Sequence, residues 1–197
     1  MEEALIIFIK NPIAGKVKTR LAASVGDEKA LFIYQALLRY TRELCESLIL
    51  KRYLYYSDFI DRADSWSELR FVKSIQSKTG LGERMLNAFL QVNEKKKVII
   101  GSDCPQLTKE DVKNAFQSLD NYDLVIGPAN DGGYYLLGMK QVHRSLFEKM
   151  EWSTETVFDE TLSRAKEANL KVKVLRELVD LDTLEDLEKT GFKIEEE

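Results

Sequence analysis

The stretch VIIGSDCP, residues 98–105, decides the fold of this chain. Its apolar residues predict a buried strand, which must end at Pro105 because proline has no backbone N–H to donate. Asp103 is therefore expected at the carboxyl end of that strand, where open α/β sheets bind their ligands. A carboxylate there can hold Mg²⁺ or Mn²⁺ together with nucleotide phosphates, although Asp is also a common turn former before proline.

Apolar and amphipathic segments alternate along the whole chain of 197 residues. This alternation predicts a three-layer α/β/α sandwich with a mostly parallel sheet, in a single domain spanning residues 1–197. The segment 134–139 follows its predecessor so closely that we expect it to run antiparallel, which makes the sheet mixed. The expected strands are 4–10, 53–57, 71–75, 97–102, 123–127, 134–139 and 171–175.

Helices are predicted where apolar residues recur at spacings of three and four. Such patterns run from Leu31 to Leu48 and from Leu81 to Val92. Thr108 is expected to cap a third helix, because an acidic residue occupies the third helical position after it. Ser153 or Thr154 is expected to cap a fourth helix that runs to about residue 168.

The composition excludes several classes of protein. The hydrophobic share of 44% and charged share of 31% are typical of a soluble globular chain, and no apolar run approaches the length of a membrane span. The net charge of −4, without a basic stripe, does not suggest nucleic-acid binding. Two cysteines, Cys45 and Cys104, form neither a disulfide framework nor a zinc spacing, so we expect a cytoplasmic protein.

A basic loop, KNPIAGKVKTRL at residues 10–21, follows the first expected strand and leads into a helix. Its four cations are Lys10, Lys16, Lys18 and Arg20. A loop in this place can offer backbone N–H groups and positive charge to a phosphate, and the alternative is a solvated basic turn. It is not a Walker A loop, because the first glycine is missing and Val17 follows the Gly-Lys pair.

A glycine-rich loop, GPANDGGYY at residues 127–135, follows another expected strand. The pair Asp131-Gly132 favours a plain hairpin, but nine residues are more than a tight hairpin requires. Glycines let the backbone approach a ligand closely, and Asp131 could bind an acceptor hydroxyl or act as its base.

Two further segments carry candidate residues. In DLDTLEDL, residues 180–187, Asp180 and Asp182 are expected on one side of an extended segment, unless Asp182 instead caps the helix that begins at Thr183. Three carboxylates brought together with Asp103 would repel one another unless a cation lay between them. The turn GLGERM, residues 80–85, is a weaker candidate, since in isolation a structural turn is the preferred interpretation.

Nucleophilic catalysis by a Ser-His or Cys-His pair is not expected. His143 is the only histidine and has no plausible partner, so we interpret it as a structural or surface residue. Cys104 follows Asp103 directly but has no identifiable base, so we interpret it as a packing residue.

The order of these motifs resembles that of the little-characterised GT-A-like transferases known as selenodomain-associated transferases, which belong with the nucleotide-diphospho-sugar transferases. The chain is also similar to the phospholactate guanylyltransferases and the molybdenum-cofactor nucleotidyltransferases. The resemblance covers nearly the whole chain and rests on residues 10–21, 81–85, 101–105, 127–138, 152–154 and 180–187.

The resemblance implies a GT-A fold, a nucleotide-activated donor, a small acceptor and a divalent metal, Mg²⁺ or Mn²⁺. The motifs and the resemblance together give four groups of site residues, which overlap. The catalytic group is Asp103, Asp131 and Lys18; the nucleotide-binding group is Lys10, Gly15, Lys18, Arg20, Gly82 and Arg84; the acceptor-binding group is Asp131, Gly132, Gly133 and Tyr134; the metal-binding group is Asp103, Asp182 and Asp180.

Two reactions fit these residues, and the sequence leaves both open. The family name favours glycosyl transfer from a nucleotide-sugar, and the alternative is nucleotidyl transfer from a nucleoside triphosphate with release of pyrophosphate. The segment around Asp103 lacks the second carboxylate of the usual glycosyltransferase Asp-x-Asp motif, and the first turn lacks the nucleotidyltransferase glycine-rich loop with its Arg-Met pair. A non-catalytic nucleotide-binding module is a third possibility.

Overall fold

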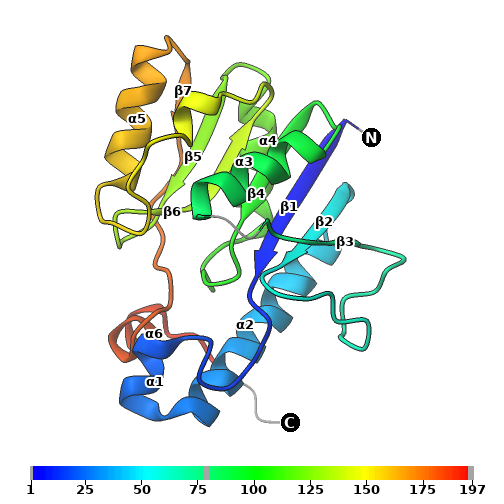
Figure 1. Ribbon diagram of the computed structural model, residues 1–197, viewed down its shortest axis with the longest axis vertical. Coiled ribbons are helices and arrows are strands. Elements are labelled where there is room, and N and C mark those ends of the chain that lie inside the picture. Colours follow the sequence, from blue (N-terminus) through cyan, green and yellow to red (C-terminus); the bar gives the residue numbers. More distant parts are fainter. Residues whose placement is uncertain (1, 78–79, 195–197) are drawn as a thin grey trace.

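The computed structural model of this chain describes residues 2–77 and 80–194. Within these residues the strands form one sheet in the order β3-β2-β1-β4-β6-β5-β7 (Figure 1). Only β6 runs against its neighbours β4 and β5, so the sheet is mixed and mostly parallel, as expected. The strands are β1 Glu3–Ile9, β2 Lys51–Tyr56, β3 Val72–Ile75, β4 Lys96–Ile100, β5 Leu124–Pro128, β6 Tyr134–Met139 and β7 Val172–Val174.

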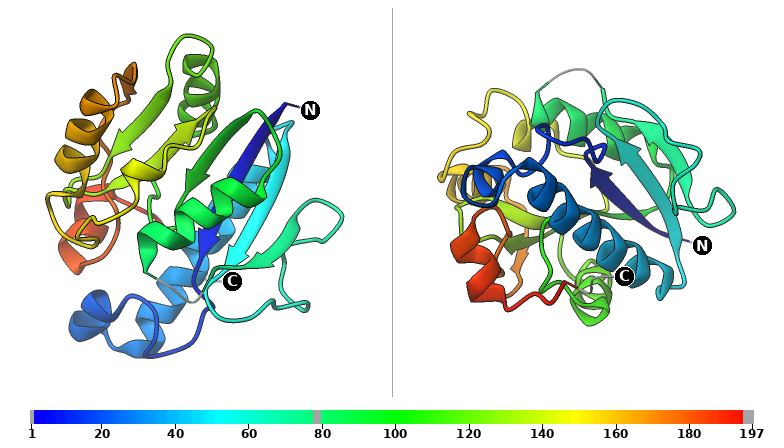
Figure 2. Two further views of the ribbon diagram at one scale, coloured as in Figure 1. Left: turned by 45° about the horizontal axis from the view of Figure 1, so that its top comes forward. Right: turned by 90° about the horizontal axis from the view of Figure 1, so that it is seen from below.

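Helices cover both faces of the sheet, which confirms the three-layer sandwich (Figure 2). Because successive side chains of a strand point to opposite faces, β1 contributes to two cores. Leu5 and Ile7 pack in the core that holds residues of α2 and α4, whereas Ala4 and Ile6 pack in the core that holds residues of α3 and α5. The helices are α1 Thr19–Val25, α2 Asp27–Glu46, α3 Leu81–Gln91, α4 Lys109–Ser118, α5 Val157–Glu167 and α6 Leu184–Thr190, with a short 3-10 helix at Arg144–Leu146.

The strand that leads to Asp103 ends two residues earlier than predicted. Pairing of β4 with β1 and with β6 stops at Ile100. Residues 101–104 therefore form a loop beyond the end of the strand. Asp103 lies in this loop, at the carboxyl edge of the sheet.

The helix caps agree with the sequence in one case and differ in two. Thr108 caps α4 in a capping box with Asp111, as expected. The prediction that Ser153 or Thr154 caps α5 is wrong: the N-cap is Thr156, which makes no side-chain cap hydrogen bond. The hydroxyl of Thr154 donates instead to the carbonyl of Glu151.

Asp182 does not cap the last helix. Thr183 is the N-cap of α6 and forms a capping box with Asp186, so the helix begins at Leu184. The carboxylate of Asp182 is therefore available for other contacts. Within the described residues, no helix is long and apolar enough to cross a membrane.

Candidate active site

A cleft of about 740 Å³ opens at the carboxyl ends of β1, β2 and β4, where open α/β sheets bind ligands. The loop after β1, the start of α3, the Asp103 loop, the glycine-rich loop and the segment before α5 all contribute to its walls. The predicted residues that line it are Lys10, Arg20, Arg84, Asp103, Asp131, Gly133, Tyr134 and Asp180.

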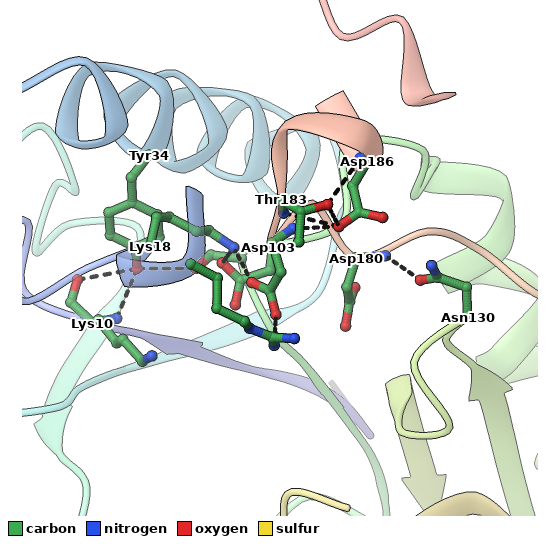
Figure 3. A network of polar contacts seen from close by, with 11 residues as sticks. Lys10, Lys18, Tyr34, Asp103, Asn130, Asp180, Thr183 and Asp186 are labelled. Atoms are coloured by element: carbon green, nitrogen blue, oxygen red, sulfur yellow. Dashed lines mark hydrogen bonds and ion pairs between the residues drawn. The ribbon is translucent and has the colours of Figure 1, made fainter. Parts of the chain in front are cut away.

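Lys18 lies at the centre of the charged groups. Its Nζ atom is 2.5 Å from Oδ1 of Asp103 and 3.0 Å from Oδ1 of Asp182, and its side chain is only 4% exposed (Figure 3). Burial lowers the pKa of Lys18, but the charges of Asp103 and Asp182 outweigh that effect and raise it, so the ammonium stays protonated. Lys18 therefore supplies part of the positive charge that the neighbouring carboxylates require.

The backbone places Lys18 by an unusual conformation. Lys18 is the N-cap of α1 with φ 48° and ψ 43°, a left-handed geometry that is uncommon for residues other than glycine. This turn aims its side chain inward, toward Asp103 and Asp182. Non-glycine residues held in such conformations cluster at functional sites.

The other basic residues of the loop collect around the same point. The guanidinium of Arg20 bonds to the second oxygen of Asp182. A recess of about 100 Å³ beside the cleft is lined by Lys10, Lys16, Lys18 and Arg20. Gly15 is not among the residues lining either space; its φ of 72° serves the turn that precedes Lys16.

A buried tyrosine, which the sequence analysis did not select, fixes this arrangement. The hydroxyl of Tyr34 in α2 accepts a bond from the backbone N–H of Lys10 at 2.8 Å and lies 3.2 Å from the hydroxyl of Ser102. Tyr34 thus joins the loop after β1 to the loop after β4. In the sequence it shows only as one member of an apolar helix face, which gives no sign of this role.

The segment that carries Asp180 and Asp182 is held against the Asp103 loop. The backbone N–H of Leu181 donates to the carbonyl of Asp103 at 2.8 Å, and that of Asp180 donates to Oδ1 of Asn130 at 3.1 Å. Asp182 lines the small recess, whereas Asp180 lines the large cleft. The two carboxylates therefore lie in adjoining spaces, and only that of Asp180 faces the large cleft.

Asp180 is a partly buried carboxylate that, among the described residues, has no ion-pair partner. In Figure 3 it lies between Asp103 and Asn130, and its carboxylate points away from the cap of α6. Burial, and then the charges of Asp103 and Asp131, raise its pKa to about 8. Such an environment favours a proton or a bound cation on Asp180.

Of the three carboxylates predicted to bind a metal, Asp103 and Asp180 line the cleft and Asp182 does not. In the part of the chain that the structure describes, no three acidic, cysteine or histidine side chains are placed to share one ion. Both oxygens of Asp182 are engaged, one by Lys18 and the other by Arg20. Asp103 and Asp180 carry the remaining oxygens that face the cleft.

The glycine-rich loop is shaped by contacts within the protein. Oδ1 of Asp131 accepts the backbone N–H of Gly133 at 2.9 Å. A Cβ on Gly132, at φ 84°, would lie 2.0 Å from the carbonyl oxygen of Glu155. Gly132 therefore allows a close approach to the segment before α5, and not to a ligand as the sequence suggested, while Gly133 and Tyr134 line the cleft.

The start of α3 forms the opposite wall. A Cβ on Gly82 would lie 2.2 Å from the indole nitrogen of Trp152, so Gly82 makes room for that ring and is not itself a lining residue. Arg84 lines the cleft beside Gln76, whose side-chain amide donates to the carbonyls of Ile9 and Tyr55. Gln76 and Trp152 position this wall, and neither was selected from the sequence.

The structure assigns no catalytic contact to Cys104 or His143, the two residues that the sequence analysis interpreted as structural. Cys104 is buried, and burial raises the pKa of its thiol to about 12, so it stays protonated. His143 precedes the short 3-10 helix Arg144–Leu146 and does not line the cleft.

Comparison with known proteins identifies the family. Residues 41–154 match the family described as "Uncharacterized protein conserved in bacteria (DUF2064)". The chain belongs to the DUF2064 family. A 2-phospho-L-lactate guanylyltransferase of Methanocaldococcus jannaschii is 27% identical over 186 residues, which cover 92% of this chain and 80% of that protein.

Solved structures share the fold of this chain. A crystal structure of a provisionally assigned nucleotide-diphospho-sugar transferase from Desulfovibrio desulfuricans G20 superposes with a TM-score of 0.86 at 31% identity, covering 94% of this chain and 84% of that one. The inositol-1-phosphate CTP transferase of T. maritima, at 15% identity and a TM-score of 0.61, covers 97% of this chain and 93% of that one and shares the fold. The expectation of a transferase enzyme, glycosyl or nucleotidyl, is confirmed at that level; the narrower selenodomain-associated label stays a prediction.

Proposed function

We propose that this DUF2064 protein is a nucleotidyltransferase, which moves a nucleoside monophosphate from a nucleoside triphosphate to a small phosphorylated acceptor. The observation that carries the proposal is the alignment with a 2-phospho-L-lactate guanylyltransferase over 92% of this chain and 80% of that protein. Nucleotidyl transfer, which the sequence left open as the alternative, is thus preferred to glycosyl transfer.

The basic loop is suited to the triphosphate. Lys10, Lys16 and Arg20 line the cleft and its adjoining recess, and Lys18 lies beneath them. Cations placed in advance around phosphate oxygens stabilise the charge that develops on the leaving pyrophosphate. In this assignment Asp182 is the counter-ion that holds Lys18 and Arg20 in position.

The donor set also fits a divalent metal. Asp180 is a desolvated carboxylate with no cation partner among the described residues, and it lies close enough to Asp103 to feel its charge. We assign Asp103 and Asp180 as the residues that would hold Mg²⁺ or Mn²⁺; the part of Asp182 in this group stays a prediction. A metal bound there would neutralise phosphate charge.

The reaction needs little further chemistry from the protein. A phosphate oxygen of the acceptor attacks the α-phosphorus, the bond from that phosphorus to the β-phosphate bridging oxygen breaks, and pyrophosphate leaves. A phosphate dianion is already deprotonated near neutral pH, so no general base is required. Asp131, predicted as a catalytic base, then acts on the acceptor by binding and orienting it.

Release of pyrophosphate tests the proposal. Each of GTP, ATP, CTP and UTP is incubated with the protein, Mg²⁺ and a panel of phosphate monoesters that includes 2-phospho-L-lactate, and pyrophosphate is measured through an inorganic pyrophosphatase. We expect acceptor-dependent release, absent in Asp103→Asn. Matched melting curves show that this variant is folded.

Glycosyl transfer is the second candidate, favoured by the 31% identical structure that is provisionally assigned to the nucleotide-diphospho-sugar transferases. The two reactions release different products. Formation of a nucleoside diphosphate from a nucleotide-sugar, with no pyrophosphate from any triphosphate, would replace our proposal with this one.

A further inference from the structure

The cations of the cleft lie on one side of it. Among the described residues that line the cleft, the cationic side chains are Lys10, Lys16, Arg20 and Arg84. Lys10 and Lys16 come from the loop after β1, Arg20 from α1 and Arg84 from α3, and Asp58, which follows β2, is a carboxylate lining this same half of the cleft. This is the half where the proposed function places the triphosphate.

The other side of the cleft is acidic. Its described charged residues are Asp131 from the glycine-rich loop, Glu155 from the segment before α5, and Asp180. No described cation pairs with any of the three, and no described cationic residue of those two segments lines the cleft. A ligand in this half meets negative charge that the protein leaves uncompensated.

The two segments that carry Asp131 and Glu155 are held together. Asp131 is fixed by the bond that it accepts from Gly133, and the backbone N–H of Phe158 donates to the carbonyl of Gly132 at 2.9 Å. The tight contact between Gly132 and Glu155 joins the two acidic segments. Asp131 and Glu155 are exposed residues of the cleft wall, and the contact at Gly132 keeps their two segments side by side.

We infer that the acceptor is a zwitterion, with a phosphate at one end and an ammonium group at the other. This inference rests on the proposed function. The phosphate faces Asp103 and the cationic half, where it attacks the α-phosphorus and displaces pyrophosphate. The ammonium lies between Asp131 and Glu155. A metal on Asp103 and Asp180 would not neutralise these two carboxylates.

The inference separates this protein from relatives named for 2-phospho-L-lactate, an acceptor that carries a carboxylate. A carboxylate in the acidic half would lie against Asp131 and Glu155 without a cation. Asp131 and Glu155 would form charge-assisted hydrogen bonds with an ammonium group, whereas they would repel a carboxylate.

Three phosphate monoesters of matched length test this: 2-aminoethyl phosphate, propyl phosphate and 2-carboxyethyl phosphate. Each is assayed for pyrophosphate release with whichever nucleoside triphosphate the wild-type protein uses. We expect kcat/KM to fall by about tenfold at each step from ammonium to methyl to carboxylate, as the loss of one charge-assisted contact implies. Preference for the carboxylate ester would overturn the inference and leave the nucleotidyltransferase proposal standing.

Variants locate the effect. Asp131→Asn and Glu155→Gln should each raise KM for 2-aminoethyl phosphate by a larger factor than KM for propyl phosphate. Glu151→Gln, an exposed carboxylate of the same segment that does not line the cleft, is the matched control. An equal loss with charged and uncharged acceptors would also overturn the inference. Absence of pyrophosphate release with every triphosphate and every acceptor would instead refute the proposed function.

Discussion

The ammonium of Lys18 lies 2.5 Å from the carboxylate of Asp103, and only 4% of the lysine side chain is exposed. The lysine thus occupies the space beside the residue that we assign to a metal. Because an ammonium and a divalent ion compete for the same carboxylate oxygen, nucleotide phosphates that draw Lys18 toward them would release Asp103. Binding of phosphate to Lys18 would thus favour binding of a metal to Asp103.

Lys18→Met should therefore have two effects. Nucleotide affinity should fall about tenfold or more, because a charge-assisted contact is lost, whereas Mn²⁺ affinity of the nucleotide-free protein should rise. Titration calorimetry and the electron paramagnetic resonance of free Mn²⁺ measure these two quantities. Lys16→Met removes an exposed cation of the same loop and should leave Mn²⁺ binding unchanged; an equal gain in both variants would contradict the competition.

Tyr34→Phe should weaken nucleotide binding without touching the nucleotide. The variant loses the hydroxyl that joins Lys10 to Ser102, which costs about 1 kcal/mol of unfolding free energy. Tyr40→Phe is the matched control, since its hydroxyl, on the same helix, donates to the carbonyl of Leu107 away from the cleft. Both variants should lose similar stability in urea titrations, and only Tyr34→Phe should raise KM for the triphosphate.

Gly132→Ala should be more destabilising than Gly26→Ala. Both glycines have φ near 85°, but a Cβ at Gly26 meets nothing within 4 Å, whereas one at Gly132 meets the Glu155 backbone. We expect a loss of about 1 kcal/mol at Gly26 from φ alone, and roughly 2–4 kcal/mol at Gly132 from φ and the clash together. Equal losses by chemical denaturation would show that the loop moves freely away from Glu155.

Asp180→Asn should stabilise the protein while removing metal-dependent turnover. A neutral amide of the same shape takes the place of a partly buried carboxylate that has no cation partner and lies near Asp103 and Asp131. Metal-free thermal melts at neutral pH should therefore show a higher Tm, by the equivalent of about 1 kcal/mol. A lower Tm would mean that Asp180 has a structural partner.

The pair Asp111–Arg176 should govern part of the acid sensitivity. The bond from Arg176 lowers the pKa of Asp111 from 3.8 to about 2. A lowered folded-state pKa contributes stability that is present above pH 3.8 and is lost as the pH falls through about 2. Asp111→Asn should lower stability at neutral pH by about 1–2 kcal/mol and flatten its decline in that window; an unchanged acid profile in calorimetry would exclude this role.

The sequence predicted the sandwich because each strand is a short, continuous apolar run with turn residues at its ends. The antiparallel direction of β6 was also predictable, since five residues cannot form a parallel crossover. The strand order was not, because it depends on which apolar runs pair across the sheet. The cap of α5 was predicted wrongly, since Thr154 turns back to Glu151 instead.

The candidate site was predictable in part for a similar reason. Asp103, Lys18, Arg20 and Asp182 stand out as charged residues next to predicted strands and helices, and the fold does bring them together. Tyr34, Ser102 and Glu155 act through contacts between segments that are far apart in the chain. No local spacing records such contacts, and a tyrosine on an apolar helix face looks the same whether or not its hydroxyl is used.

The bond from Leu181 to Asp103 has a consequence for the order of assembly. The centre of the site is complete only when the segment 180–182 docks, and that segment is held by α6, which lies beside α1 (Figure 1). During synthesis the basic loop is made early and its counter-ion Asp182 late. A chain that has folded its first strands but has not docked this segment therefore lacks Asp182 beside Lys18 and Arg20, and we expect activity to begin only after docking.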